Sequence, residues 1–337
     1  MAEKTPAAIL LNPFQRARIY GQTELEAIYE RCNVLVEAAP EEVHAPKWAD
    51  ALRRVEVVWS GWGGLKLTSE VLERLPALRL YLYSAGTVKS HVTEATWERG
   101  VRVCGAWAAN AVPVAEFAFA QVILCLKHAW QFAAAYTQAR RGIALESPGH
   151  LGAFGTTVGL ISLGQIGQRL AERLKSLDVE VIAYDPYVSR EAMAALGLRK
   201  VESMLEIFQR SEVVSLHTPW LPETEGLLRR EHFQAMKPGA AFINTARGAV
   251  VDEPALIEVL QARPDLFACL DVTWPEPPAP DSPLWALPNI FLTPHLAGAQ
   301  AGECRRMCRY MIEEFDRWRA GETLQHEITR ERLPLLG

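Results

Sequence analysis

The sequence has no strong excess of charge of either sign. Its 337 residues carry a net charge of −5, and charged residues make up 22% of the chain. We therefore expect no basic face for nucleic acid or for an anionic membrane. We also expect no apolar run of the ~20 residues that cross a bilayer, and residues 1–6 lack the features of a signal peptide. These absences predict a cytoplasmic protein with neither a membrane nor a nucleic acid as partner.

Cysteine is scarce, and no Cys-x-x-Cys motif occurs. The six cysteines are scattered along the chain, at positions 32, 104, 125, 269, 304 and 308. This pattern is typical of reduced, mostly buried thiols. Cys304 and Cys308, four residues apart on a predicted helix, could share a metal ion. No His or Cys pair nearby would complete such a site, so we predict no metal.

Short apolar runs alternate with helical patterns along the whole chain, which predicts an α/β protein of about two domains. The first set of predicted strands covers 7–11, 34–38, 55–60, 78–83 and 101–104. The second set covers 157–162, 180–184, 213–216, 240–244, 267–270 and 290–292. Six strands separated by helical segments fit a doubly wound dinucleotide-binding fold in the second part of the chain.

Three further segments shape the predicted domain organisation. Residues 110–127 form a long apolar helical run, which we expect to be buried between domains or subunits. Residues 139–154 contain several Gly and Pro residues and are interpreted as a linker. Residues 301–320 are predicted to be a helix, and the tail 324–337 is long enough to pack back on the first domain.

The segment 158–167 matches a dinucleotide-binding turn with one departure. The usual G-x-G-x-x-G becomes Ser162-x-Gly164-x-x-Gly167. Gly164 would let the backbone approach a pyrophosphate, and Gly167 would let the next helix, predicted over 168–177, pack close to the strand. Gln165 and Ile166 lie between them and complete the predicted phosphate-binding turn.

An acidic residue at the end of the next strand supports this interpretation. Asp185 follows Gly167 at about the 20-residue spacing expected of the acid that binds the ribose hydroxyls. A carboxylate there repels a 2′-phosphate, so NAD is favoured over NADP. The alternative is a strand–turn–helix without a ligand, but the strand before, the helix after and Asp185 together favour cofactor binding.

Three candidate catalytic residues each follow a predicted strand. They are Arg247, Glu276 and His295. Alone, each has a simpler explanation: a structural salt bridge, an exposed loop acid and a core histidine. Ligands of open α/β sheets bind outside the carboxyl ends of the strands, so the shared placement favours a common site. An arginine fork binds a carboxylate, and a histidine can pass a proton to a neighbouring carbonyl oxygen.

At these motifs the chain resembles the D-isomer-specific 2-hydroxyacid dehydrogenases, most strongly from residue 110 to 298. The resemblance implies that Arg247 binds substrate, that His295 is the general acid/base and that Glu276 is its paired acid. It also implies a substrate-carboxylate loop at Ala85, Gly86 and Thr87. The remaining implied cofactor contacts are Thr218, Pro219, Thr224, Thr245, Ala246, Asp271, His295 and Gly298.

The resemblance further implies how the domains are arranged. A Rossmann NAD-binding domain, residues 110–299, would be inserted in a flavodoxin-like substrate domain made of residues 1–109 and 300–337. Both would have doubly wound parallel sheets, and the protein would be a homodimer.

The expected activity is hydride transfer between NAD(H) and a small 2-hydroxy or 2-keto acid of the D series. Two departures from the family pattern, Ser162 and residues 87–89, leave the identity of the substrate open. The alternative is a non-catalytic NAD(H)-sensing protein, since some relatives on this scaffold are transcriptional corepressors.

Overall fold

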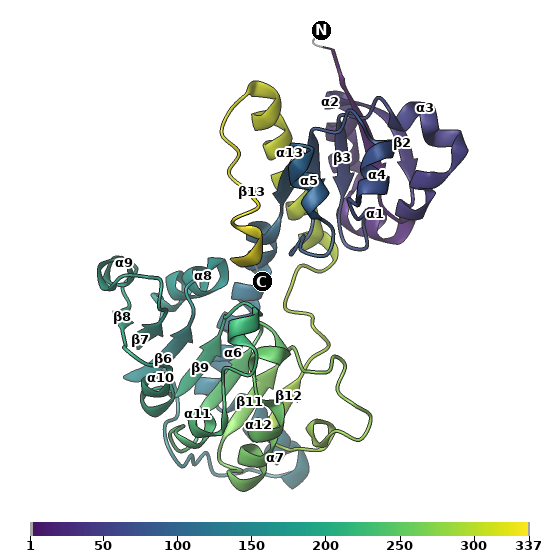
Figure 1. Ribbon diagram of the computed structural model, residues 1–337. Helices are drawn as coiled ribbons and strands as arrows, with labels where there is room; N and C mark the ends of the chain where they lie inside the picture. Colours follow the sequence, from purple (N-terminus) through teal and green to yellow (C-terminus); the bar gives the residue numbers. More distant parts are fainter. Residues whose placement is uncertain (1–2, 336–337) are drawn as a thin grey trace. The chain divides into compact units, whose positions relative to one another are not determined.

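The computed structural model describes residues 3–335, which divide into two compact units. Unit 1 contains the residues up to Asn110 and those from Ala299 onward, and unit 2 is Ala111–Gly298 (Figure 1). Each unit is built around one sheet. The α/β class predicted from the alternating pattern is therefore confirmed.

The sheet of unit 1 has the strand order β13-β5-β4-β3-β1-β2. Its strands are β1 (Thr5–Leu10), β2 (Cys32–Ala38), β3 (Val57–Ser60), β4 (Leu80–Tyr83), β5 (Arg102–Gly105) and β13 (Glu327–Ile328). The first five are parallel and have the order 2-1-3-4-5 of a flavodoxin-like sheet. The short β13 pairs antiparallel with β5, so the C-terminal tail forms one edge of this sheet.

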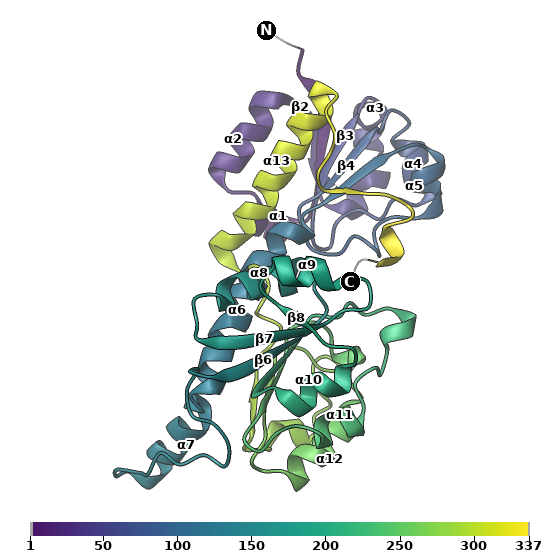
Figure 2. The same cartoon turned by 90° about the vertical axis from the view of Figure 1, so that its left-hand side faces the viewer.

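Helices cover both faces of that sheet (Figure 2). One face carries α1 (Pro13–Ile19), α2 (Gln22–Arg31) and α13 (Cys304–Ala320), and the other carries α3 (Ala49–Leu52), α4 (Ser69–Arg74) and α5 (Glu94–Glu98). Alternate residues of β1 explain the two cores, because successive strand residues point to opposite faces. Ile9 packs with Phe315 of α13, while Leu10 packs in the cluster of Leu72 of α4.

A buried carboxylate holds the returning tail. Glu314 of α13 is fully buried and accepts hydrogen bonds from the backbone N–H groups of Gln325 (3.3 Å) and His326 (3.1 Å). Arg317 forms an ion pair with the same carboxylate. Because the charge is both paired and hydrogen-bonded, its burial is compensated, and the tail is held beside β5.

The sheet of unit 2 has the order β12-β11-β10-β9-β6-β7-β8, and all its strands are parallel. Its strands are β6 (Thr156–Ile161), β7 (Val179–Tyr184), β8 (Arg199–Lys200), β9 (Val213–Leu216), β10 (Ala241–Asn244), β11 (Phe267–Leu270) and β12 (Ile290–Leu292). Counted within the unit, the order is 3-2-1-4-5-6 with a seventh strand, as in a Rossmann fold.

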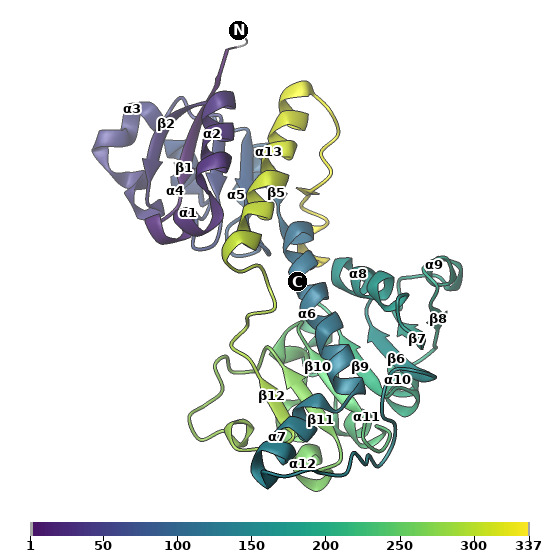
Figure 3. The same cartoon turned by 180° about the vertical axis from the view of Figure 1, so that it is seen from behind.

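The helices of unit 2 surround its sheet, and most of them lie on one of its two faces (Figures 1 and 3). They are α6 (Trp107–Leu126), α7 (Ala129–Ala139), α8 (Gln165–Leu174), α9 (Arg190–Ala195), α10 (Met204–Arg210), α11 (Arg230–Gln234) and α12 (Glu253–Ala262). Val122 of α6 and Leu170 of α8 share a core with Leu160 of β6. Phe208 of α10 and Leu256 of α12 pack on the other face.

Short 3-10 turns connect many of these elements. They are η1 (Pro40–His44), η2 (Pro46–Trp48), η3 (Pro222–Thr224), η4 (Gly248–Val250), η5 (Pro283–Trp285), η6 (Ala301–Glu303) and η7 (Leu333–Leu335). The helix predicted over 301–320 thus begins as a 3-10 turn and becomes α-helical at Cys304.

Two expectations need correction. Within residues 3–335, α6 alone is long and apolar enough to cross a membrane by length and composition, with 20 residues and a mean hydropathy of 1.6. The prediction that no apolar run reaches this length was therefore wrong, although 56% of its most apolar window is buried, as in the core helix of a soluble protein. The helix predicted over 168–177 instead begins at Gln165 and ends at Leu174.

Candidate functional site

The carboxyl edge of the unit 2 sheet carries nearly all the predicted site residues. Because the strands are parallel, their C-terminal ends lie along one edge of the sheet. The segments that leave this edge contain Ser162 after β6, Asp185 after β7, His217 after β9, Arg247 after β10, Asp271 after β11 and His295 after β12. The strand order reverses between β6 and β9, and Ser162 Oγ is 2.8 Å from Thr218 Oγ1 across this switch point.

The turn between β6 and α8 has the geometry of a phosphate-binding loop. Ser162 has a φ of 74°, a left-handed conformation that explains why a glycine commonly stands there. A Cβ at Gly164 would meet no atom within 4 Å, so the backbone is open to a ligand. A Cβ at Gly167 would lie 2.3 Å from the carbonyl oxygen of Ser162, so a side chain there would force α8 away from the turn.

Asp185 anchors the same turn. One carboxylate oxygen accepts the N–H of Leu163 (2.8 Å) and the other accepts the N–H of Tyr187 (2.8 Å). Two oxygens provide about four acceptor positions, so ribose hydroxyls could still be bound. The structure therefore assigns Asp185 a local role that the sequence did not reveal, and its contact with a ribose stays a prediction.

Two buried polar atoms near this edge have no partner within residues 3–335. They are His217 Nδ1 and Thr245 Oγ1. Burial lowers the pKa of His217 to about 4, so its ring is neutral at pH 7, and its Nε2 is 3.0 Å from Ser215 Oγ. An unpartnered buried donor or acceptor costs free energy unless a ligand satisfies it. Together with the open Gly164, these atoms fit a polar cofactor.

His295 and Glu276 form a close pair, although they are 19 positions apart in the chain. The distance from His295 Nδ1 to Glu276 Oε1 is 2.6 Å, and the two side chains are 44% and 38% exposed. A carboxylate on Nδ1 fixes the orientation of the ring. The other ring nitrogen, Nε2, is then the atom that can exchange a proton with a ligand.

A buried aspartate holds the loop that carries His295. Asp271 is 2% exposed and accepts hydrogen bonds from Thr293 Oγ1 (2.6 Å) and from the N–H groups of Leu296 (2.8 Å) and Ala297 (2.9 Å). His295 itself has a φ of 51°, which is uncommon for a residue with a side chain. The surrounding bonds maintain this strained conformation. Contact of Asp271 with the nicotinamide ribose stays a prediction.

Arg247 is the third predicted catalytic residue, and we refer to Arg247, Glu276 and His295 together as the trio. Burial lowers the pKa of the Arg247 guanidinium, and the negative charge of Glu276 partly offsets this effect. Arg247 therefore interacts electrostatically with the same carboxylate that holds His295. One of its five N–H donors is bound to the carbonyl oxygen of Ala246 (2.6 Å). The remaining donors are those that a carboxylate ligand would meet.

The other predicted residues of unit 2 have local roles in the structure. Thr224 Oγ1 bonds the carbonyl oxygen of Pro219 (2.6 Å) and closes the loop after β9. Ala246 is buried and Gly298 is partly buried, while Gln165 and Ile166 open helix α8. None of these bonds excludes a cofactor contact, and that role stays a prediction for each.

The predicted carboxylate loop belongs to unit 1. The N–H of Ala85 donates to the carbonyl oxygen of Tyr83 (2.8 Å), so one of the three predicted donors is already engaged. Ser84, just before it, is buried and lies 3.2 Å from the hydroxyl of Tyr20. Gly86 and Thr87 follow Ala85 in the chain. Substrate binding by this loop stays a prediction.

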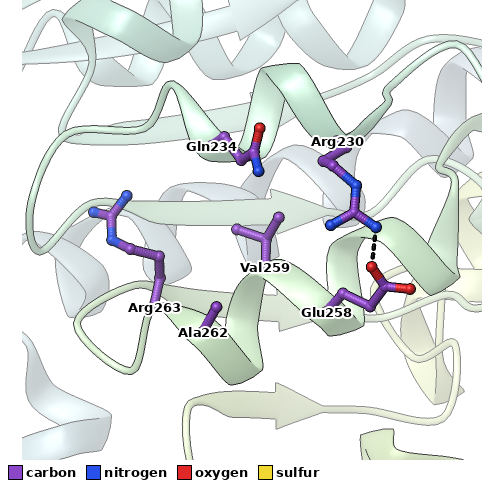
Figure 4. A pocket seen from close by; sticks show the side chains of 6 residues that line it. All are labelled: Arg230, Gln234, Glu258, Val259, Ala262 and Arg263. Carbon is purple, nitrogen blue, oxygen red and sulfur yellow. Dashed lines mark hydrogen bonds and ion pairs between the residues drawn. The ribbon is translucent and has the colours of Figure 1, made fainter.

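A cavity of about 270 Å³ lies elsewhere on unit 2, between α11 and α12 (Figure 4). Its lining residues are Arg230, Gln234, Glu258, Val259, Ala262 and Arg263. Both arginines are already paired, Arg230 with Glu258 and Arg263 with Asp265. Because both arginines already have an acidic partner and none of the predicted site residues lines the cavity, we assign it no ligand.

Packing around the trio includes contacts that the sequence did not reveal. A Cβ at Gly248 would lie 2.0 Å from the carbonyl carbon of Thr273, so only glycine allows the loops after β10 and β11 to touch. Glu253 accepts the N–H of Trp274 (2.9 Å). Gly248 next to Arg247 was the only available signal, since a glycine beside a functional residue often marks a close backbone approach.

Comparison with known proteins gives a consistent result. Residues 122–297 match the family described as D-isomer specific 2-hydroxyacid dehydrogenase, NAD binding domain. The chain is 31% identical to a glyoxylate reductase of Korarchaeum cryptofilum, over 79% of this chain and 80% of that protein. A phosphoglycerate oxidoreductase structure from Rhizobium etli, 23% identical, superimposes with a TM-score of 0.83 over 97% of this chain and 99% of that one, which shows a shared fold.

Some relatives are much longer. The chain is 31% identical to the D-3-phosphoglycerate dehydrogenase of Methanocaldococcus jannaschii, over 80% of this chain but only 51% of that protein. The chain thus spans about half the length of the phosphoglycerate dehydrogenases it matches.

Proposed function

We propose that this chain, which belongs to the D-isomer specific 2-hydroxyacid dehydrogenase family, transfers a hydride between NAD(H) and a small 2-hydroxy or 2-keto acid. The single observation that carries the proposal is the 2.6 Å contact between His295 and Glu276. It provides an oriented proton donor on the same sheet edge as Arg247 and the dinucleotide turn.

The cofactor is NAD, and the residues present fit it. Residues 162–167 and the first turn of α8 would hold the pyrophosphate, and Asp185 would meet the ribose. The unpartnered His217 Nδ1 and Thr245 Oγ1 lie at the exits of β9 and β10 and would meet polar groups of the nicotinamide half. When bound, NADH supplies the hydride.

The protein's own groups would supply binding and the proton. Arg247 would bind the keto acid's carboxylate and polarise its carbonyl, because a guanidinium fork matches both acceptors. Protonated His295 would give its Nε2 proton to the oxygen as it becomes an alkoxide. Glu276 would keep the ring oriented and stabilise the imidazolium. For unit 1, we propose that the backbone N–H groups of Gly86 and Thr87 can bind a carboxylate.

Steady turnover tests this proposal against the non-catalytic alternative. The names of the relatives, a reductase and dehydrogenases, support the enzyme. We expect oxidation of NADH with at least one of glyoxylate, hydroxypyruvate, pyruvate, 2-ketoisocaproate and phenylpyruvate. Tight NADH binding without turnover of any acid would instead support a sensing protein.

We also propose a cytoplasmic homodimer. Helix α7 has no buried residue, and beyond Trp130, which stacks on Phe291 of β12, it extends away from the sheet of unit 2 (Figure 2). It and the following segment expose Tyr136 (60%), Leu145 (63%) and Phe154 (88%), a set of apolar side chains that a second copy would cover. Sedimentation should show a dimer that Tyr136→Glu weakens. A monomeric wild-type protein would contradict this proposal.

A further inference from the structure

Two tryptophans pair at the edge of unit 2 that carries the trio. Trp220 follows β9 and Trp274 follows β11, and their rings lie edge to face with centroids 4.8 Å apart. Trp220 is 37% exposed and Trp274 is 52% exposed. The Nε1–H of Trp220 donates to Glu225 (3.2 Å), and the backbone N–H of Trp274 donates to Glu253 (2.9 Å). The Trp220 indole and the Trp274 backbone are thus held in place, while a large part of the surface of both residues remains open.

The packing of the loops places this pair beside the proposed catalytic residues. Thr273, immediately before Trp274, packs its backbone against Gly248, immediately after Arg247. Two positions after Trp274 in the chain, Glu276 holds His295. Trp274 therefore stands on the short segment that joins the arginine side of the trio to the histidine side.

The chemistry of the pair indicates what covers it. A tryptophan buries roughly 150–250 Å² of surface when fully covered, and aromatic rings favour other rings at offset or edge-to-face geometry. The carboxylates of Glu225 and Glu253 bond these same tryptophans, and they would repel a second anionic group such as a phosphate. The surface therefore suits an uncharged apolar group.

We propose that Trp220 and Trp274 form the wall that receives the side chain of the 2-keto acid, and that this side chain is aromatic or branched and apolar. This inference rests on the proposed function, because it places the reacting carbonyl at Arg247 and His295. It distinguishes the chain's substrate from glyoxylate, which has no side chain, and from a phosphorylated acid.

The test compares kcat/KM for phenylpyruvate and glyoxylate with NADH. Wild-type protein should prefer phenylpyruvate by roughly tenfold or more, the lower range of what apolar contacts contribute to specificity. Trp220→Ala and Trp274→Ala should each reduce that preference by about 10-fold or more, and Trp274→Phe should restore most of it. The matched control is Trp285→Ala, since Trp285 is 55% exposed on η5 and bonds Ala279 instead. That variant should keep the wild-type preference.

Several outcomes would overturn the inference while leaving the proposed function intact. One is a wild-type enzyme that reduces glyoxylate at least as well as phenylpyruvate. Another is an equal loss for both acids in Trp220→Ala and Trp274→Ala, which would mean that the pair only supports Glu276. If no acid is reduced, the proposed function fails first, and calorimetric binding of phenyllactate to the NADH complex decides the inference. If Trp220→Ala and Trp274→Ala each bind phenyllactate about tenfold more weakly than wild type, the proposed side-chain wall is supported. If their binding of phenyllactate is unchanged, the proposal is refuted.

Discussion

Replacing each of the two glycines of the dinucleotide turn by alanine should affect a different property of the protein, NADH binding for Gly164 and folding stability for Gly167. A Cβ at Gly164 meets no protein atom within 4 Å, and its φ of −70° suits any residue. Gly164→Ala should therefore fold normally but occupy the space where the pyrophosphate approaches. A Cβ at Gly167 would lie 2.3 Å from the Ser162 carbonyl oxygen, so Gly167→Ala must move α8.

The expected magnitudes follow from these two situations. Gly164→Ala should lose at least one charge-assisted hydrogen bond of about 1.5–3 kcal/mol, which weakens NADH binding by roughly 10- to 150-fold. Gly167→Ala should lower the free energy of unfolding by about 1–3 kcal/mol, the usual cost of overpacking. For a unit of this size the melting temperature falls by about 2–4 °C for each kcal/mol.

Fluorescence titration with NADH and urea unfolding measure the two effects separately. Gly164→Ala should change the dissociation constant and leave the unfolding midpoint within error of wild type. If it binds NADH as tightly as wild type, the turn does not hold the pyrophosphate. If it unfolds as early as Gly167→Ala, the space beside Gly164 is not open.

Three further predictions concern single side chains. Asp185→Asn should reduce the preference for NADH over NADPH, measured as a ratio of kcat/KM values, and equal use of NADPH by wild-type protein would show that the acid does not select the cofactor. Arg247→Lys keeps the positive charge but loses the planar, two-donor geometry of the guanidinium. The value of kcat/KM for the keto acid should therefore fall about 100-fold, while the affinity for NADH should not change. An unchanged kcat/KM would mean that Arg247 has only a structural role. Burial lowers the pKa of His217 to about 4 in the folded protein, so as the pH falls His217 is protonated in the unfolded chain before it is protonated in the folded one. The free energy of unfolding should therefore decrease as the pH falls from about 6.5 toward 4. The loss is on the order of 3 kcal/mol, and a His217→Gln variant with the same acid dependence in urea unfolding would contradict it.

The strands of both sheets could be predicted because each is an apolar run long enough to be recognised. The six strands predicted in unit 2 all form, within a residue or two of the expected limits. β8 and β13 were missed because two residues carry no periodic pattern and pair only through tertiary context. α7 was not predicted either, since only its first turn is partly buried and the rest of the helix has no apolar face toward the core.

The location of the site was also predictable, because the exits of parallel strands share one edge. The pairing of His295 with Glu276 depended on the family resemblance, and the structure brings the two together. The role of Asp271 in holding the His295 loop could not be predicted, since it depends on backbone N–H groups that any sequence supplies. The pairing of Trp220 with Trp274 was missed because it joins two loops that are distant in sequence.

The rate of NADH oxidation by wild-type protein and by His295→Asn, with the best keto acid of the panel, tests the central proposal most directly. General acid catalysis contributes about 10²- to 10⁴-fold, so His295→Asn should lose at least a hundredfold in kcat while its dissociation constant for NADH stays within about threefold of wild type. A His295→Asn protein that reduces the keto acid at a near-normal rate would contradict the proposed role of His295 and the mechanism built on it.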